Sequence, residues 1–88
     1  MDIVFSKHAE EQMKRRGICR EQVLSVISMP EEVIIDTDDP TVRIYQSVVE
    51  EQGKSFLLRV FVNICKQPQV IITLYRTTKI SKYYEGKI

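Results

Sequence analysis

The sequence of 88 residues predicts an α+β domain in which two N-terminal helices pack on one face of a four-stranded, twisted, antiparallel sheet. Three observations predict this ααββββ order. Two short segments with helix caps come first, the apolar period changes from helical to extended after Pro30, and stretches rich in β-branched residues follow. A chain of this length has room for one core, so we expect residues 1–88 to form a single domain.

The first helix is predicted between two residues with strong capping preferences. Ser6 is a good N-cap, and Gly17 suits the left-handed residue that follows a helix, with Ile18 placed to fold back onto the last turn. We therefore expect a helix over 7–16, with Ala9 and Met13 on one side of it.

A second helix is predicted over 20–28, almost without a linker. Val23, Leu24 and Ile27 form its apolar side. Pro30 ends it, because a proline disfavours helical geometry at the residue before it.

The remainder of the chain is predicted to form four strands. A β-branched run over 33–36 leads into a turn at 38–41. Three longer strands follow over 42–50, 54–65 and 69–77, joined by a turn at Gly53 and another around Pro68.

Side-chain alternation sorts these strands into a core face and an outer face. The core face carries an unbroken apolar file on the third strand, which consists of Phe56, Leu58, Val60, Val62 and Ile64. The outer face is more polar, and its members are Arg43, Tyr45, Arg59, Asn63, Thr73 and Tyr75. Two helices suffice to cover the core face, so we expect the polar face to stay open to solvent.

The single histidine, His8, falls in the first turn of the predicted first helix. A helix N-terminus carries unpaired N–H groups and a partial positive charge, which favour the neutral, proton-accepting imidazole. His8 is therefore a candidate for proton transfer. The alternative is that His8 packs at the rim of the core and hydrogen-bonds a carbonyl group.

Charge is segregated along the chain although the net charge is only +1. Residues 1–20 carry five cations and three acids (+2), residues 21–51 one arginine and eight acids (−7), and residues 52–88 seven cations and one acid (+6). If the first helix and the last strand lie side by side, they form a positive zone that can hold a polyanion. The alternative is a mixed surface that serves only solubility.

Several classes of protein are excluded by composition. The sequence has no run of about 18 apolar residues that would span a bilayer, and charged residues stand near its start where a signal peptide needs an apolar stretch. We therefore expect a cytoplasmic protein without membrane contact. Cys19 and Cys65 belong to no C-x-x-C pair, so we expect no metal or other cofactor. Cys65 ends an apolar run and is expected to be buried.

Several segments resemble a known family. The opening Phe5-Ser6-x-His8-Ala9, the helix end at 15–18, the Met29-Pro30 stop and the strand at 71–75 are similar to the small proteins of domain of unknown function 4258. That family is grouped with RelE- and BrnT-like toxins. The resemblance implies helices before a twisted sheet whose open face binds RNA, cleavage of RNA without a metal ion, and silencing by an antitoxin protein.

The resemblance also implies roles for single residues. His8 would act as base or acid, Arg59 and Arg76 as phosphate clamps, and Tyr75 as a stacking or proton-relaying group. The remaining candidates for RNA contact are Arg15, Arg16, Arg43, Tyr45, Asn63, Lys79, Lys82 and Tyr83. Alternative roles are cross-strand packing for Tyr45 and Tyr75, and a salt bridge from Arg59 to Glu32 or Glu50.

Three functions follow from this reading. The first is a toxin-like, metal-independent endoribonuclease acting on single-stranded RNA, in which His8 and the guanidinium groups share one solvent-facing hollow. The second is a binding module of the same fold that holds nucleic acid or an acidic protein segment without cleaving it. The third is a self-associating structural protein, a homodimer that pairs through a sheet edge at 33–36 or 69–77.

Overall fold

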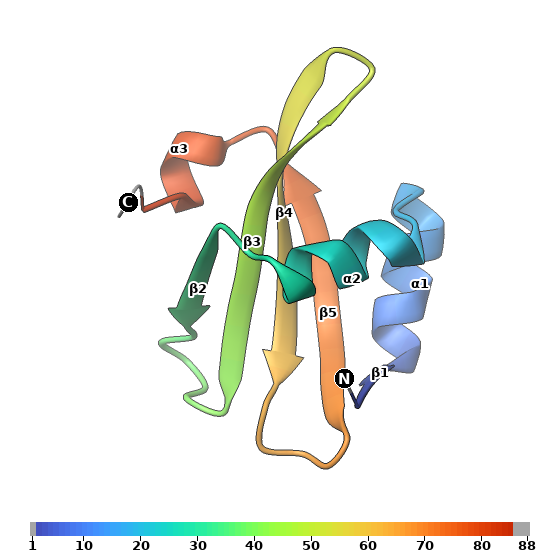
Figure 1. Ribbon diagram of the computed structural model, residues 1–88, viewed down its shortest axis with the longest axis vertical. Coiled ribbons are helices and arrows are strands. Elements are labelled where there is room, and N and C mark those ends of the chain that lie inside the picture. Colours follow the sequence, from blue (N-terminus) through green and yellow to red (C-terminus); the bar gives the residue numbers. More distant parts are fainter. Residues whose placement is uncertain (1, 86–88) are drawn as a thin grey trace.

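The computed structural model describes residues 2–85, which fold into one sheet and three helices (Figure 1). In chain order the elements are β1 (Ile3–Phe5), α1 (Lys7–Arg16), α2 (Arg20–Ser28), β2 (Glu32–Ile35), β3 (Val42–Glu51), β4 (Lys54–Asn63), β5 (Gln69–Thr77) and α3 (Ile80–Tyr83). Within residues 2–85, every helix is too short or too polar to cross a membrane.

The sheet has five strands in the order β1-β5-β4-β3-β2, and β1 runs parallel to β5. The prediction of four antiparallel strands was therefore wrong at the N-terminus, although β2 to β5 are antiparallel as expected. A strand of three residues is too short to show an alternating pattern. Long-range pairing defines it instead, since hydrogen bonds from Gln69 N–H to the Asp2 carbonyl and from Ser6 N–H to the Ile71 carbonyl continue the ladder.

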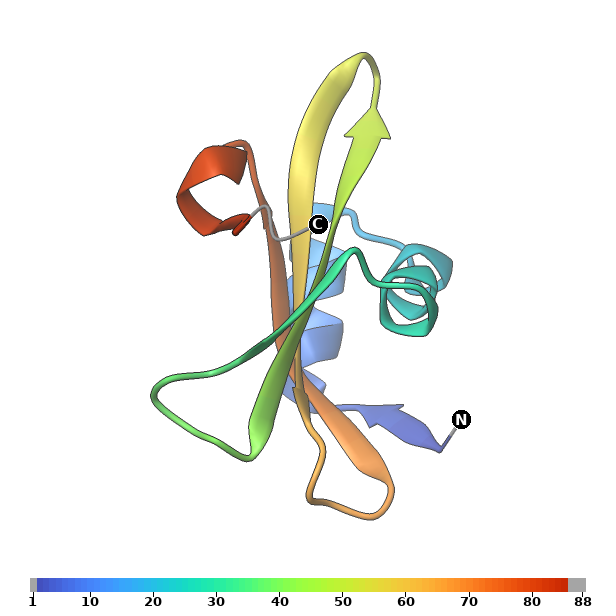
Figure 2. The same ribbon diagram turned by 60° about the vertical axis from the view of Figure 1, so that its left-hand side comes forward.

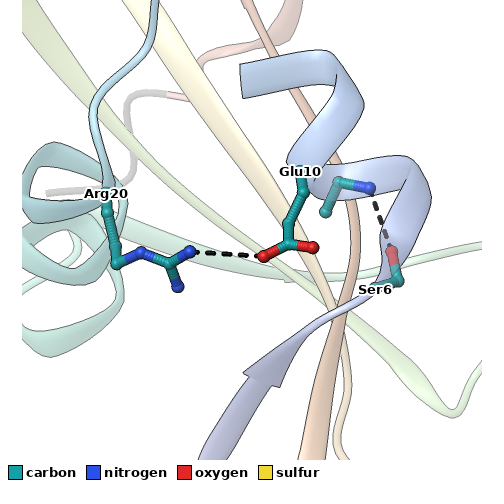
Figure 3. A network of polar contacts seen from close by, with 4 residues as sticks. Ser6, Glu10 and Arg20 are labelled. Atoms are coloured by element: carbon teal, nitrogen blue, oxygen red, sulfur yellow. Dashed lines mark hydrogen bonds and ion pairs between the residues drawn. The ribbon is translucent and has the colours of Figure 1, made fainter. Parts of the chain in front are cut away.

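Both predicted N-terminal helices are confirmed, together with the caps of α1. The Ser6 hydroxyl accepts a hydrogen bond from Ala9 N–H at 3.0 Å (Figure 3), and Gly17 adopts φ 67° at the other end. An N-cap of this kind contributes about 1 kcal/mol. Figure 3 also shows the Glu10–Arg20 ion pair, 3.3 Å long, which joins α1 to the start of α2.

The main core lies between the sheet and α1 and α2, on what we call the helix face. Leu58, Val60 and Val62 of the predicted apolar file are fully buried there, packed against residues such as Ala9 and Val23. Burial of this kind contributes about 25 cal/mol per Å² of apolar surface. The predicted core file is therefore confirmed at its centre.

The opposite side of the sheet, which we call the far face, is not open as predicted. Figure 2 shows α3 on the side of the sheet opposite α1 and α2. Val42, Ile44 and Leu57 are buried and, by strand alternation, belong to this face. The sequence after Thr77 has too short a helical period to predict that it would fold back over the sheet.

The predicted faces of β3 are exchanged. Gln46 is paired with Arg59 and lies on the far face, whereas Tyr45 is paired with Val60 and packs against the main core. Arg43 shares the parity of Tyr45, so both predicted outer-face residues of β3 are on the helix face. Apolar residues occupy both faces of β3, which is why alternation alone misassigned them.

The end of β4 also differs from the prediction. The strand stops at Asn63, and Cys65 lies in the following turn, where it is exposed rather than buried.

Candidate functional site

Four side chains from four neighbouring strands form a hydrogen-bonded row across the far face. Gln46 Nε2 donates to Glu32 Oε1 at 2.6 Å, Arg59 Nε donates to Gln46 Oε1 at 2.8 Å, and Arg59 Nη1 donates to the Tyr75 hydroxyl at 2.7 Å. We call Glu32, Gln46, Arg59 and Tyr75 the far-face row. Each member lies directly opposite the next in the strand register.

The turn between β3 and β4 fixes this register. Gln52 and Gly53 form a two-residue connection with φ of 52° and 78°. Two consecutive positive φ values are typical of the tight hairpin turns that match the twist of a sheet. With Glu51 opposite Lys54, the count along both strands brings Gln46 opposite Arg59.

Arg59 is buried although it carries a fixed charge. Arg59 is only 8% exposed, and Gln46 beside it is fully buried. The Arg59 Cζ lies 4.4 Å from the ring centre of Tyr83, 5.5 Å from that of Phe61 and 5.8 Å from that of Tyr75. Hydrogen bonds and aromatic faces thus replace water around the guanidinium group.

The far-face row also holds the chain that follows β5. The Tyr83 carbonyl accepts a hydrogen bond from Gln46 Nε2 at 3.1 Å, and Glu85 N–H donates to Glu32 Oε1 at 3.0 Å. The rings of Tyr75 and Tyr83 meet edge to face at 6.3 Å. The same side chains that surround Arg59 therefore position α3.

Two neighbouring tyrosines at this site have pKa values shifted in opposite directions. The Lys82 ammonium lowers the pKa of the Tyr83 hydroxyl, and Tyr75 and Arg59 lower it further against the opposing effect of burial. Burial raises the pKa of Tyr84, and the carboxylates of Glu31 and Glu32 raise it further. Nearby cations stabilise phenolate, so Tyr83 ionises more readily than an ordinary tyrosine.

A cleft of about 340 Å³ opens between α3 and β2, and Arg59, Lys82 and Tyr83 contribute to its lining. Ile34, Ile44 and Tyr84 add apolar and aromatic surface. The cleft thus joins two cations, two tyrosines and apolar side chains, and the acidic residues Asp36 and Glu85 also line it. The cations and the flat rings suit a ligand with a phosphate and a planar ring. Among residues 2–85, no three His, Cys, Asp or Glu side chains are grouped so that they would hold a metal ion.

The structure brings together only some of the residues predicted from the sequence. Arg59, Lys82 and Tyr83 line the cleft, and Tyr75 contacts Arg59 and Tyr83 beside it. Lys79 immediately precedes α3. Asn63 has a local role, since its side chain accepts a hydrogen bond from Cys65 N–H at 3.0 Å. Arg43 likewise donates to the Pro40 carbonyl at 2.8 Å.

A second group of predicted residues belongs to the helix side. The first helix and the last strand lie side by side, since α1 packs beside β5 and Arg76 Nη2 donates to the Arg16 carbonyl at 2.8 Å. Arg76 Nη1 also pairs with Glu51 at 2.6 Å. Arg15 is exposed in the same last turn of α1.

His8 does not join either set of guanidinium groups. It is exposed on α1, eight residues before Arg16, and the helical rise separates these two positions by about 12 Å. Arg59 belongs to the opposite side of the sheet. The shared hollow expected for His8 and the guanidinium groups is therefore not formed.

Gln46 was not among the residues predicted for the site, and Glu32 was named only as a salt-bridge partner for Arg59. In the structure Gln46 hydrogen-bonds both Glu32 and Arg59. The signal for Gln46 was present, because a two-residue turn at Gln52-Gly53 already implies the register that pairs it with Arg59. Glu32 follows from Gln46 only once the pairing of β2 is known.

The family described as Domain of unknown function (DUF4258) matches residues 5–76. The chain belongs to the DUF4258 family. No curated protein and no solved structure matches the chain. In this DUF4258 protein the far-face row lies inside the matched residues, whereas α3, which supplies Lys82 and Tyr83, lies beyond them.

Replacing Gln46 should destabilise the protein, because Gln46→Met deprives the buried Arg59 Nε–H of its acceptor. We expect the free energy of unfolding to fall by about 2–3 kcal/mol. Urea denaturation followed by circular dichroism measures the change. Gln12→Met is the matched control, since Gln12 bonds Arg16 at the surface, and it should cost less than about 0.5 kcal/mol.

The same experiment includes the variant that carries both Gln46→Met and Arg59→Met. The free energy of unfolding of this double variant should fall by less than the sum of the falls in the two single variants, because the charge that needs the acceptor is gone. Equal effects of Gln46→Met and Gln12→Met, with additive losses in the double variant, would contradict the assignment of a coupled row.

Proposed function

We propose that this protein is a metal-independent endoribonuclease of the RelE- and BrnT-like toxin type, which acts on single-stranded RNA at the far-face cleft. The observation that carries the proposal is the position of Tyr83. Its ring covers the Arg59 guanidinium at 4.4 Å, and the neighbouring Lys82 lowers the pKa of its hydroxyl. A proton acceptor and fixed cations are thereby adjacent.

The proposed reaction uses these groups in turn. The Tyr83 phenolate takes the proton of a 2′-hydroxyl, whose oxygen then attacks the adjacent phosphorus atom. Arg59 and Lys82 stabilise the added negative charge on the phosphate oxygens. The bond from phosphorus to the 5′-oxygen breaks, and the Lys82 ammonium supplies the proton to that leaving oxygen, which yields a cyclic phosphate and a free 5′-hydroxyl.

Base contact in this proposal falls to the aromatic wall of the cleft. Tyr84 lines the cleft, and burial and acidic neighbours raise its pKa, so it stays neutral. A neutral ring can stack on an unpaired base, whereas a base held inside a duplex would not reach it. This arrangement supports single-stranded RNA as the substrate class.

The proposal moves proton transfer away from His8, which is exposed on the other side of the molecule. It retains an antitoxin as partner, because a protein that covers the cleft beside α3 would block access to Arg59 and Tyr83.

A second candidate is a binding module that holds single-stranded RNA in the same cleft without cleaving it. The hydrogen bonds of Arg59 favour this binding module, since two N–H groups of the guanidinium are already directed to Gln46 and Tyr75. Such a module would show binding that weakens steeply with salt and no cleavage products.

Tyr83→Phe should abolish most cleavage, because it removes the proton acceptor and leaves the ring over Arg59. Loss of a general base lowers a rate by about 100-fold or more. The assay uses purified protein, labelled single-stranded RNA and a chelator, with thermal melting as a check on folding. His8→Ala and Tyr84→Phe are the matched controls and should retain the rate of the wild-type protein.

Three results would decide between the candidates. Full activity of Tyr83→Phe together with loss of activity in His8→Ala would contradict the far-face site. Wild-type protein that binds the RNA without releasing products would replace the nuclease with the binding module. Absence of both binding and cleavage would exclude both.

The pH dependence of cleavage should report the Tyr83–Lys82 contact. Because Lys82 lowers the pKa of Tyr83, the rate should rise with pH as Tyr83 loses its proton, below the usual range for tyrosine. Lys82→Gln removes this cation, which is also the proposed acid, so the rate should fall and the rise of the rate should begin at higher pH. Lys79→Gln serves as control and should leave the rise in place, and a rise unmoved by Lys82→Gln would contradict the assignment.

A further inference from the structure

We propose that the free edge of β2 is a docking site for an extended, basic segment of another polypeptide, which adds to the sheet as a further strand. This inference does not depend on the proposed ribonuclease activity. It concerns the outer edge of β2, where Ile35 and Asp36 also line the cleft between β2 and α3, and it requires only pairing of a strand with this edge.

The backbone of β2 is paired on one side. Among residues 2–85, β3 is its only neighbour in the sheet. Asp36 N–H donates to the Val42 carbonyl at 3.1 Å, so the backbone of Asp36 points towards β3. Antiparallel ladders alternate, and the N–H and C=O groups of Val33 and Ile35 therefore point to the outside.

The side chains at this edge are apolar and exposed. Val33 is 50% exposed, Ile35 57%, and Met29 at the end of α2 83%. By alternation Val33 and Ile35 project to the helix side, beyond the reach of α2, which packs on β3 and β4. Two of the four exposed large hydrophobic residues described by the structure thus lie on β2.

Elsewhere the same side of the sheet is protected. Glu31 lies just before β2. Its carboxylate accepts a hydrogen bond from Val48 N–H at 3.1 Å and so covers the part of the β3 edge that β2 does not pair with. Proteins usually guard exposed edges in this way, with charges, bulges or prolines. On β2 itself, the two positions whose backbone faces outward carry isoleucine and valine instead.

The acidic residues around β2 indicate what kind of segment would bind at its edge. The segment 21–51 has a net charge of −7, and Glu31, Asp36, Asp38 and Asp39 flank β2. A second copy paired antiparallel through β2 about a two-fold axis at Ile34 would bring Glu32 opposite Asp36 at both ends, which is unfavourable. A strand with alternating apolar and basic residues meets both the exposed Val33 and Ile35 and the surrounding carboxylates.

The test uses a short peptide in which valine and lysine alternate, with a valine–glutamate peptide of equal length as the comparison. Titration into the 88-residue protein, followed by NMR, should show binding of the basic peptide only, with slower hydrogen exchange at the amides of Val33 and Ile35. Affinity should fall as salt is raised.

Two substitutions on opposite edges of the sheet provide the control. Val33→Lys should weaken binding about tenfold, because it places a cation against the basic peptide and removes apolar contact. Val4→Lys changes a residue of similar exposure, 44%, on β1, and should leave the affinity unchanged. Thermal melting verifies that both variants fold.

Each alternative outcome would overturn the proposal. Equal binding of both peptides, equal effects of Val33→Lys and Val4→Lys, or absence of binding would exclude a basic strand at β2. A dimer seen by light scattering without peptide, and abolished by Val33→Lys, would make a second copy the occupant instead.

Discussion

The guanidinium group of Arg59 is the constraint on which the far side of this protein depends. A charge removed from water is costly unless hydrogen bonds and polarisable surfaces replace the solvent. Gln46, Tyr75 and Tyr83 provide them, and to do so they must come from two neighbouring strands and from the chain after β5. The position of α3, and with it the cleft, follows from this requirement.

The predictable part of the fold is the part governed by local signals. Ser6, Gly17 and Pro30 mark the ends of α1 and α2, and the apolar file around Val60 identifies the core face of β4. β1 and α3 were missed because three or four residues are too few to display a period. Their positions are set by contacts with β5 and the far-face row, which are distant in sequence.

The candidate site was predicted in part. Arg59 and Tyr75 were assigned to one outer face correctly, since β4 and β5 alternate clearly in this region. On β3, apolar residues occur on both faces, so Tyr45 was predicted on the outer face, which Gln46 in fact occupies. The register of the Gln52-Gly53 turn resolves this ambiguity, which shows that turn geometry can carry information that alternation lacks. His8 satisfied the local criteria for proton transfer, but the sheet separates it from Arg59.

Hydrogen exchange at the Arg59 Nε–H, observed by NMR at neutral pH, tests the far-face row most directly. This proton is directed to Gln46 Oε1 in a buried row, so it should exchange much more slowly than the Nε–H of Arg43, whose side chain bonds an exposed loop carbonyl. Equal exchange of the two protons would mean that Arg59 is solvated, and that neither the far-face row nor the cleft beside it has the structure described.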